Sequence, residues 1–235
     1  SRINKTSDEF SLELSNFFTS NDIDKTKINE LSLCSVVPTL TDTIVVSLKS
    51  LTNQEPLIVG PGTRTGIQIN YDRTQDVGAD RIANAVAVNH IYGNPAIVID
   101  MGTATVFDVM IKGPKYIGGA IAPGIQVSAE AIARETSQLP KVELVAPSSV
   151  IGKNTIESIQ SGFVYGFVHM IEGMTKRIKT KIHKNERDLV KVIATGGLAH
   201  IITPHTNIFY DVNKDLTLHG LRIIKDINQK DNAVK

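Results

Sequence analysis

No other stretch of the sequence constrains the fold as strongly as VIDMGTATVFDVMI, residues 98–111. An apolar run ends at Asp100, a tight turn follows at Gly102 and Thr103, and a second apolar run begins directly after it. Two apolar runs of strand length joined in this way predict a β-hairpin. Burying a lone carboxylate in hydrocarbon costs roughly several kcal/mol, so Asp100 should have a cation, hydrogen-bond donors or water within reach.

The rest of the chain mixes helical and strand patterns. A third antiparallel strand is expected at 116–124, before a helix that begins at 125. Upstream we expect a helix over 6–21, a strand at 31–37 that Pro38 breaks, and a helix over 41–52 with Asp42 in its first turn. We then expect a strand at 56–60, an irregular segment over 61–78 and a helix over 79–91. Downstream we expect a long helix within 151–182, a buried strand at 189–197 and a closing helix at 222–230. This mixture predicts an α/β or α+β protein with a boundary near 92–95.

Composition excludes several classes of function. The 235 residues carry 25 basic and 24 acidic side chains without a basic block, so nucleic acid and membrane surfaces are poor candidates for partners. The one cysteine, Cys34, lies in an apolar run, where a buried inert thiol and a reducing cytoplasm are expected. No apolar run reaches the roughly 18 to 20 residues that span a bilayer. The polar opening SRINKTSDEF has no signal-peptide layout and no initiator methionine, so we expect the chain to begin partway into the natural one.

The turn at Gly102 and Thr103 is suited to phosphate. Backbone N–H groups and a hydroxyl at the end of a strand form a small concave site that accepts phosphate oxygens. Phosphate brings cations, so Asp100 is placed to hold a metal or to face the charged groups. The alternative is that Asp100 only caps the turn by an Asx-type hydrogen bond, and both interpretations stay open.

Two further motifs have candidate chemistry. In ATGG, Gly196 and Gly197 end an apolar strand, which suits close approach of the backbone to a flat or phosphorylated ligand, although such a pair is also common in turns and helix packing. In GADRIAN, Asp80 could accept a proton from a hydroxyl while Arg81 binds an anionic substrate. The structural alternative makes Asp80 a helix N-cap and Arg81 a solvated side chain.

Six motifs occur here in the order found in the type III pantothenate kinases: GADRIAN, IDMGTATVFD, GGAIAPG, LPKVEL, IGKNT and ATGG. The chain resembles this family over essentially its whole length, and SVVPTLT upstream also fits the family pattern. The resemblance implies an actin-like α/β fold of the acetate and sugar kinase class, with two ribonuclease-H-like halves at 1–93 and 94–235. It also implies a homodimer that transfers phosphate from ATP to the primary hydroxyl of pantothenate, giving 4'-phosphopantothenate in the first step of coenzyme A biosynthesis.

The resemblance also implies roles for individual residues. Asp80 is similar to the general base of the family. Five other positions correspond to contacts of the pantothenate pocket, with the last of them near the dimer interface: Gly78, Ala79, Arg81, Tyr71 and Thr155.

On the phosphate side, Thr103 resembles a phosphate-contacting residue. Asp100 resembles the ligand of the monovalent cation, potassium or ammonium, that the family requires. We therefore expect ATP with Mg²⁺ to bind at Gly102, Thr103, Gly196 and Gly197, and the monovalent cation to bind at Asp100.

The chain departs from the family pattern in two ways. Val106 stands where the family usually has a second threonine, which should affect packing more than chemistry. The initial strands of the first half, with their own phosphate-binding turn, are absent from the sequence, so these 235 residues alone are not expected to catalyse. Two rival hypotheses therefore stay open: a catalytically silent regulatory or scaffold dimer, and an actin-like kinase or phosphatase for another small carboxylate-bearing acceptor.

Overall fold

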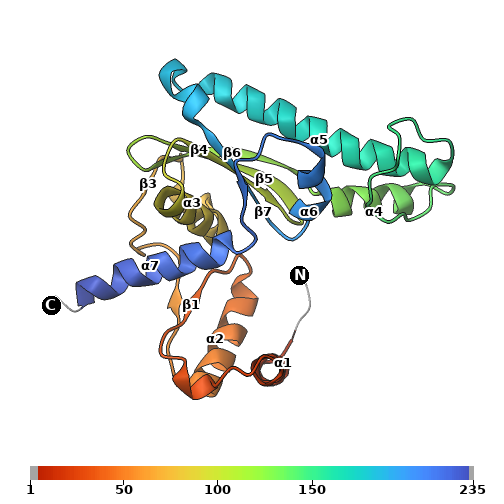
Figure 1. Ribbon diagram of the computed structural model, residues 1–235. Helices are drawn as coiled ribbons and strands as arrows, with labels where there is room; N and C mark the ends of the chain where they lie inside the picture. The colour runs from red at the N-terminus through yellow and green to blue at the C-terminus, as the bar shows by residue number, and fades with distance from the viewer. Residues whose placement is uncertain (1–4, 233–235) are drawn as a thin grey trace. The chain divides into compact units, whose positions relative to one another are not determined.

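The computed structural model describes residues 5–232, and the chain forms two compact units (Figure 1). Unit 1 comprises the residues up to Gly66, Arg73–Ala87 and the residues from Thr217 onward. Unit 2 comprises Ile67–Asp72 and Val88–Leu216. The first four residues of the polar opening lie outside the described residues. Within residues 5–232, no helix combines the length and apolar character needed to cross a membrane.

Unit 2 is built on one six-stranded sheet in the order β3-β6-β5-β4-β7-β8. The strands are β3 (Gln68–Ile69), β4 (Ala96–Met101), β5 (Ala104–Ile111), β6 (Lys115–Pro123), β7 (Lys191–Thr195) and β8 (Asp211–Val212). β4, β5 and β6 are antiparallel, as the sequence predicts, whereas β7 runs parallel to β4 and β8 runs parallel to β7. Parallel pairing of β4 with β7 makes both strands end at the same edge of the sheet.

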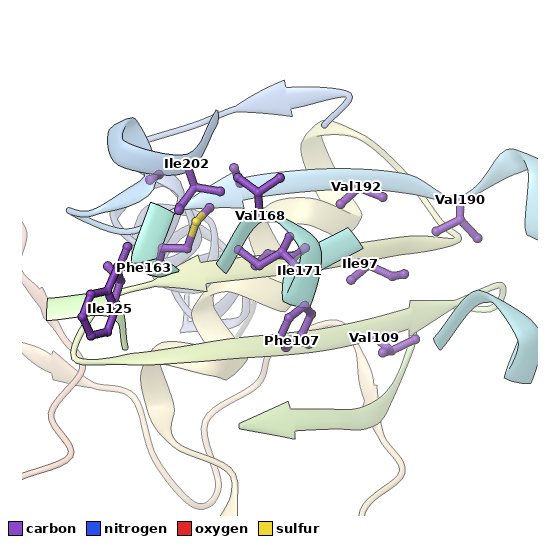
Figure 2. Close-up of a cluster of buried hydrophobic side chains, with 14 of the residues drawn as sticks. Ile97, Phe107, Val109, Ile125, Phe163, Val168, Ile171, Val190, Val192 and Ile202 are labelled. Carbon is purple, nitrogen blue, oxygen red and sulfur yellow. The ribbon is translucent and has the colours of Figure 1, made fainter. Parts of the chain in front are cut away.

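The helices of unit 2 bury one face of this sheet. They include α4 (Ile125–Glu135), α5 (Thr155–Lys181) and the short α6 (Ala199–Ile202), with 3-10 turns at Lys184–Leu189 and Thr203–His205. Figure 2 shows Phe163, Val168 and Ile171 of α5 among side chains of the sheet that include Ile97 and Phe107. Ile97, Phe107 and Ile171 are fully buried, so the apolar period of α5 is explained by contact with the sheet. The alternate residues of β4, including Asp100, point to the other face.

Unit 1 contains the remaining elements. They are α1 (Ser7–Ser20), β1 (Ser32–Leu33), α2 (Pro38–Thr52), β2 (Leu57–Ile58), most of α3 (Ala79–Ile91) and nearly all of α7 (Leu216–Asn232), with 3-10 turns at Lys25–Lys27 and Thr74–Asp76. β1 and β2 pair in parallel. α1 begins where the sequence predicts because Thr6 and Glu9 form a capping box.

Several predicted boundaries are wrong. α2 begins at Pro38 and not at residue 41, because proline at the first helical position has a suitable φ and lacks only an N–H that would be unpaired there. Asp42 therefore lies in the second turn and not in the first. The predicted strands at 31–37 and 56–60 are each only two residues long, and the segment expected to be irregular contains β3.

The closing helix α7 belongs with unit 1 and not with the residues from 94 to 216 as expected from the sequence. A Cβ placed on Gly220 of α7 would lie 2.0 Å from the carbonyl oxygen of Ala83, so the backbones of α7 and α3 are in direct contact. Thr217 also donates a hydrogen bond of 2.7 Å to the buried side chain of Asn84. Whether each unit corresponds to a ribonuclease-H-like half stays a prediction.

Candidate active site

Two glycine-containing turns meet at one edge of the unit 2 sheet. Asp100 near the end of β4 is paired in register with Thr195, the last residue of β7. The turn after Asp100 and the turn after Thr195 are therefore neighbours, and the N–H of Leu198 donates to the carbonyl of Met101 at 2.9 Å. The sequence presents these turns as separate motifs almost a hundred residues apart, and the structure brings them together.

Asp100 lies against the backbone of Gly196. A Cβ on Gly196 would lie 2.5 Å from Asp100 Oδ1 and 2.6 Å from the N and C atoms of Met101, and Gly196 has φ of +92°. Any other residue would collide there and adopt an unfavourable backbone conformation. Asp100 Oδ1 would also be 3.7 Å from a Cβ on Gly102, so the half-buried carboxylate lies between the two turns.

The group at this edge of the sheet that could hold a cation is the carboxylate of Asp100, between the two turns. Among residues 5–232, no group of three or more His, Cys, Asp and Glu side chains could hold a metal ion. A carboxylate oxygen such as that of Asp100 is a ligand that hard cations prefer.

A third glycine completes this part of the site. The N–H of Gly124 donates to the carbonyl of Thr103 at 3.1 Å, and a Cβ on Gly124 would lie 2.4 Å from that oxygen and 2.5 Å from the carbonyl oxygen of Gly102. α4 begins at Ile125, so its N-terminus abuts the turn. Helix N-terminal N–H groups favour anions. Gly124 is the last residue of the motif GGAIAPG, and no role was predicted for it.

A buried polar pair follows on the sheet face that includes Asp100. Asp108 is fully buried and accepts a hydrogen bond of 2.8 Å from the hydroxyl of Tyr116. The ring of Tyr71 lies 6.3 Å from the ring of Tyr116, and Cε2 of Tyr71 would be 3.2 Å from a Cβ on Gly118, whose φ is +101°. Asp108 was not predicted as a site residue, although a carboxylate within the apolar run VFDVMI is the same signal that identified Asp100.

Asp80 lies in the first turn of α3, in unit 1. Ala79 is the first helical residue, so Asp80 is not the N-cap that the structural alternative required. Its Oδ1 accepts a hydrogen bond of 2.8 Å from the N–H of Arg81 and would lie 2.5 Å from a Cβ on Gly78. Burial and, secondarily, the charge of Asp80 raise the pKa of the Cys34 thiol above its usual range.

Thr155 is the first residue of α5, in unit 2. The N-cap Asn154 accepts a hydrogen bond of 2.9 Å from the N–H of Glu157, which fixes this end of the helix and leaves Thr155 exposed. A Cβ on Gly152 would lie 2.4 Å from the N atom of Ser158, so the preceding loop packs directly on the first turn.

The predicted site residues thus fall into two groups. Unit 1 carries the four contiguous positions Gly78, Ala79, Asp80 and Arg81. Unit 2 carries Tyr71, Asp100, Gly102, Thr103, Thr155, Gly196 and Gly197.

The architecture is mixed α/β. In structure the chain is similar to a Campylobacter jejuni protein described as a Baf family transcriptional activator, with a TM-score of 0.59 and 20% identity, over 92% of this chain and 89% of that one. In sequence it is 47% identical to a type III pantothenate kinase of Dehalococcoides mccartyi, over 86% of this chain and 77% of the relative. It is also 43% identical to a type III pantothenate kinase of Moorella thermoacetica, over 95% and 87%.

The type III pantothenate kinase family matches residues 1–177. The chain belongs to this family, and the prediction from its motifs is confirmed.

Proposed function

We propose that Asp80 is the general base of a phosphoryl transfer from ATP to pantothenate. The overall reaction follows from the family: ATP-dependent phosphorylation of pantothenate to 4'-phosphopantothenate, the first step of coenzyme A biosynthesis. The observation that carries the assignment of the base is the position of the Asp80 carboxylate, in the first turn of α3 with one oxygen already oriented by the N–H of Arg81. A carboxylate held in this way can accept the proton of the acceptor hydroxyl as the phosphoryl group is transferred.

The acceptor is bound by the residues around this carboxylate. Arg81, next to Asp80, is suited to the carboxylate of pantothenate because a guanidinium offers two parallel N–H donors. Gly78 and Ala79 have little or no side chain, which lets the acceptor approach the backbone at the start of the helix. On the resemblance to the family, we propose Tyr71 and Thr155 as further contacts of the acceptor, and we propose that the enzyme is a homodimer.

The phosphates of ATP are proposed to bind at the edge of the unit 2 sheet. Gly102, Thr103, Gly196 and Gly197 offer backbone N–H groups and one hydroxyl, and the N-terminus of α4 adds its partial positive charge. Phosphoryl transfer depends mainly on positioning and electrostatic stabilisation, so fixed donors of this kind are the contribution expected from the protein.

Asp100 is proposed to hold a potassium or ammonium ion beside these phosphates. Such a cation, and the Mg²⁺ that accompanies ATP, would reduce the negative charge of the phosphate groups. The position of the Asp100 carboxylate between Gly102 and Gly196 supports this assignment. We also propose that the enzyme works in the cytoplasm.

The test is product formation by the purified full-length protein. ATP, Mg²⁺ and pantothenate should give ADP and 4'-phosphopantothenate, followed by mass spectrometry, whereas small hydroxy acids without the pantothenate skeleton should react far more slowly. Equal turnover of several such acceptors would favour the kinase of another substrate. Binding of pantothenate and ATP without turnover would favour the silent regulatory dimer.

A further inference from the structure

An exposed apolar side chain lies beside the proposed base. Val36, in the turn between β1 and α2, is 63% exposed. A Cβ on Gly78 would lie 3.4 Å from Cγ1 of Val36 and 2.5 Å from Oδ1 of Asp80. The methyl group of Val36 and the carboxylate of Asp80 therefore flank the same backbone position, and all three residues belong to unit 1.

The backbone on each side of Val36 is well fixed. The hydroxyl of Ser35 donates to the carbonyl of Val37 and accepts from the N–H of Val37, both at 3.2 Å. The same carbonyl accepts from the N–H of Leu40 at 3.0 Å, and Pro38 starts α2 immediately afterwards. Single exposed apolar residues are common. Val36, in contrast, is held in a defined turn next to the candidate base Asp80, so its side chain is placed to contact the acceptor.

The chemistry of the acceptor supplies the reason for an apolar group at this position. In pantothenate, the carbon that bears the primary hydroxyl is bonded to a carbon with two methyl groups. When the hydroxyl is within hydrogen-bond distance of Asp80, the two methyl groups must also lie close to Asp80. A purely polar surface there would not remove the methyl groups from water favourably. Val36 is the apolar side chain that borders Gly78.

We propose that Val36 binds the two methyl groups of pantothenate and so selects acceptors that carry a branched carbon beside the reacting hydroxyl. This inference rests on the proposed function and extends it to substrate specificity.

The experiment compares two acceptors and three variants of the full-length enzyme. The acceptors are pantothenate and an analogue in which hydrogens replace both methyl groups. The variants are Val36→Ala, Val36→Thr and the control Val46→Ala, which truncates a valine of similar exposure (55%) on α2. KM and kcat are measured for each, with calorimetric Kd values for both acceptors and a thermal melt of every protein.

We expect Val36→Ala and Val36→Thr to raise the KM and Kd for pantothenate roughly five- to tenfold, with kcat within about twofold, because a small apolar contact has been lost. With the analogue, both variants should match wild type within about twofold, since the analogue has no methyl groups to bind. Val46→Ala should match wild type with both acceptors, and all melting temperatures should agree.

Three results would overturn the proposal. These are an unchanged affinity for pantothenate in both Val36 variants, an equal loss of affinity for both acceptors, and a loss of folding stability that accounts for the change. If wild type phosphorylates pantothenate normally while one of these results is obtained, the inference on Val36 fails alone. If wild type neither binds nor phosphorylates pantothenate, the proposed function fails together with it.

Discussion

Asp80 and Asp100 are two carboxylates placed in different ways. Asp80 is held by its neighbours in sequence, since the groups around its Oδ1 are the N–H of Arg81 and the backbone of Gly78. Asp100 is held by a distant segment, since its Oδ1 lies over Gly196, which reaches it through the pairing of β4 with β7.

The difference matches the two roles that we propose for these carboxylates. A proton acceptor needs one free oxygen and a fixed direction, which a single helical turn provides. A cation site beside phosphates needs oxygens and N–H groups from several segments, and only neighbouring strands bring these together. The following predictions test whether the two carboxylates have separate roles.

The largest effect is expected at Asp80. Asp80→Asn keeps the shape of the side chain and its acceptor for the Arg81 N–H but removes the proton acceptor, so turnover should fall about a hundredfold or more. Steady-state kinetics measures this, and calorimetry should show pantothenate still bound. Asp42→Asn, the same change on α2, should leave turnover unchanged. A decrease of less than about threefold would make Asp80 a structural residue.

The next effect is on stability, at Gly196. Gly196→Ala introduces a Cβ at φ of +92° that meets Asp100 and Met101, so the free energy of unfolding should fall by about 2 kcal/mol or more. The matched control is Gly197→Ala, because a Cβ on Gly197 meets no atom within 4 Å. Urea unfolding of the three proteins measures the difference. Equal stabilities would mean that the two turns are not packed as described.

A smaller effect is expected on the cation dependence at Asp100. Asp100→Asn keeps the shape but removes the charge, so the potassium concentration for half-maximal activity should rise about tenfold, or about 1.4 kcal/mol, while the melting temperature changes little. Wild type should be active in potassium or ammonium and much less active in sodium. Activity without potassium in wild type, or a variant that loses stability with an unchanged potassium response, would return Asp100 to the role of turn cap.

The smallest effect concerns the pH dependence of Cys34. Its pKa is raised, so the thiolate is scarce near neutral pH, and alkylation by iodoacetamide should accelerate only at more alkaline pH than in the unfolded chain. Because the pKa of Cys34 is higher in the folded than in the unfolded chain, its contribution to folding stability is complete below the unfolded-state pKa. That contribution is lost as the pH rises through the folded-state pKa. Asp80→Asn should move the alkylation midpoint to lower pH, because the charge of Asp80 contributes to the shift. An unmoved midpoint would separate Cys34 from Asp80.

Elements specified by local patterns were predicted well. α3 has the predicted bounds, and the hairpin β4–β5 turns at Gly102 and Thr103 as predicted, because the alanine-rich helix start and the apolar runs around Gly102 act within a few residues. The motifs that identify the family are also local, so the catalytic class was predicted from the sequence. The boundary of α2 was missed because Pro38 was taken only as the end of a strand, although it also begins a helix.

What the sequence by itself determined is therefore the identity of the chemical groups: a carboxylate beside a guanidinium at Asp80 and Arg81, and a carboxylate before a glycine turn at Asp100. The tertiary structure alone decided which groups meet. Gly196 reaches Asp100 only through strand register, Tyr116 reaches Asp108 across β5 and β6, and α7 joins α3 only because Gly220 allows backbone contact with Ala83. Periodicity reports which side chains a segment buries, whereas the partner of a buried face is set by long-range packing and pairing, which no single segment encodes.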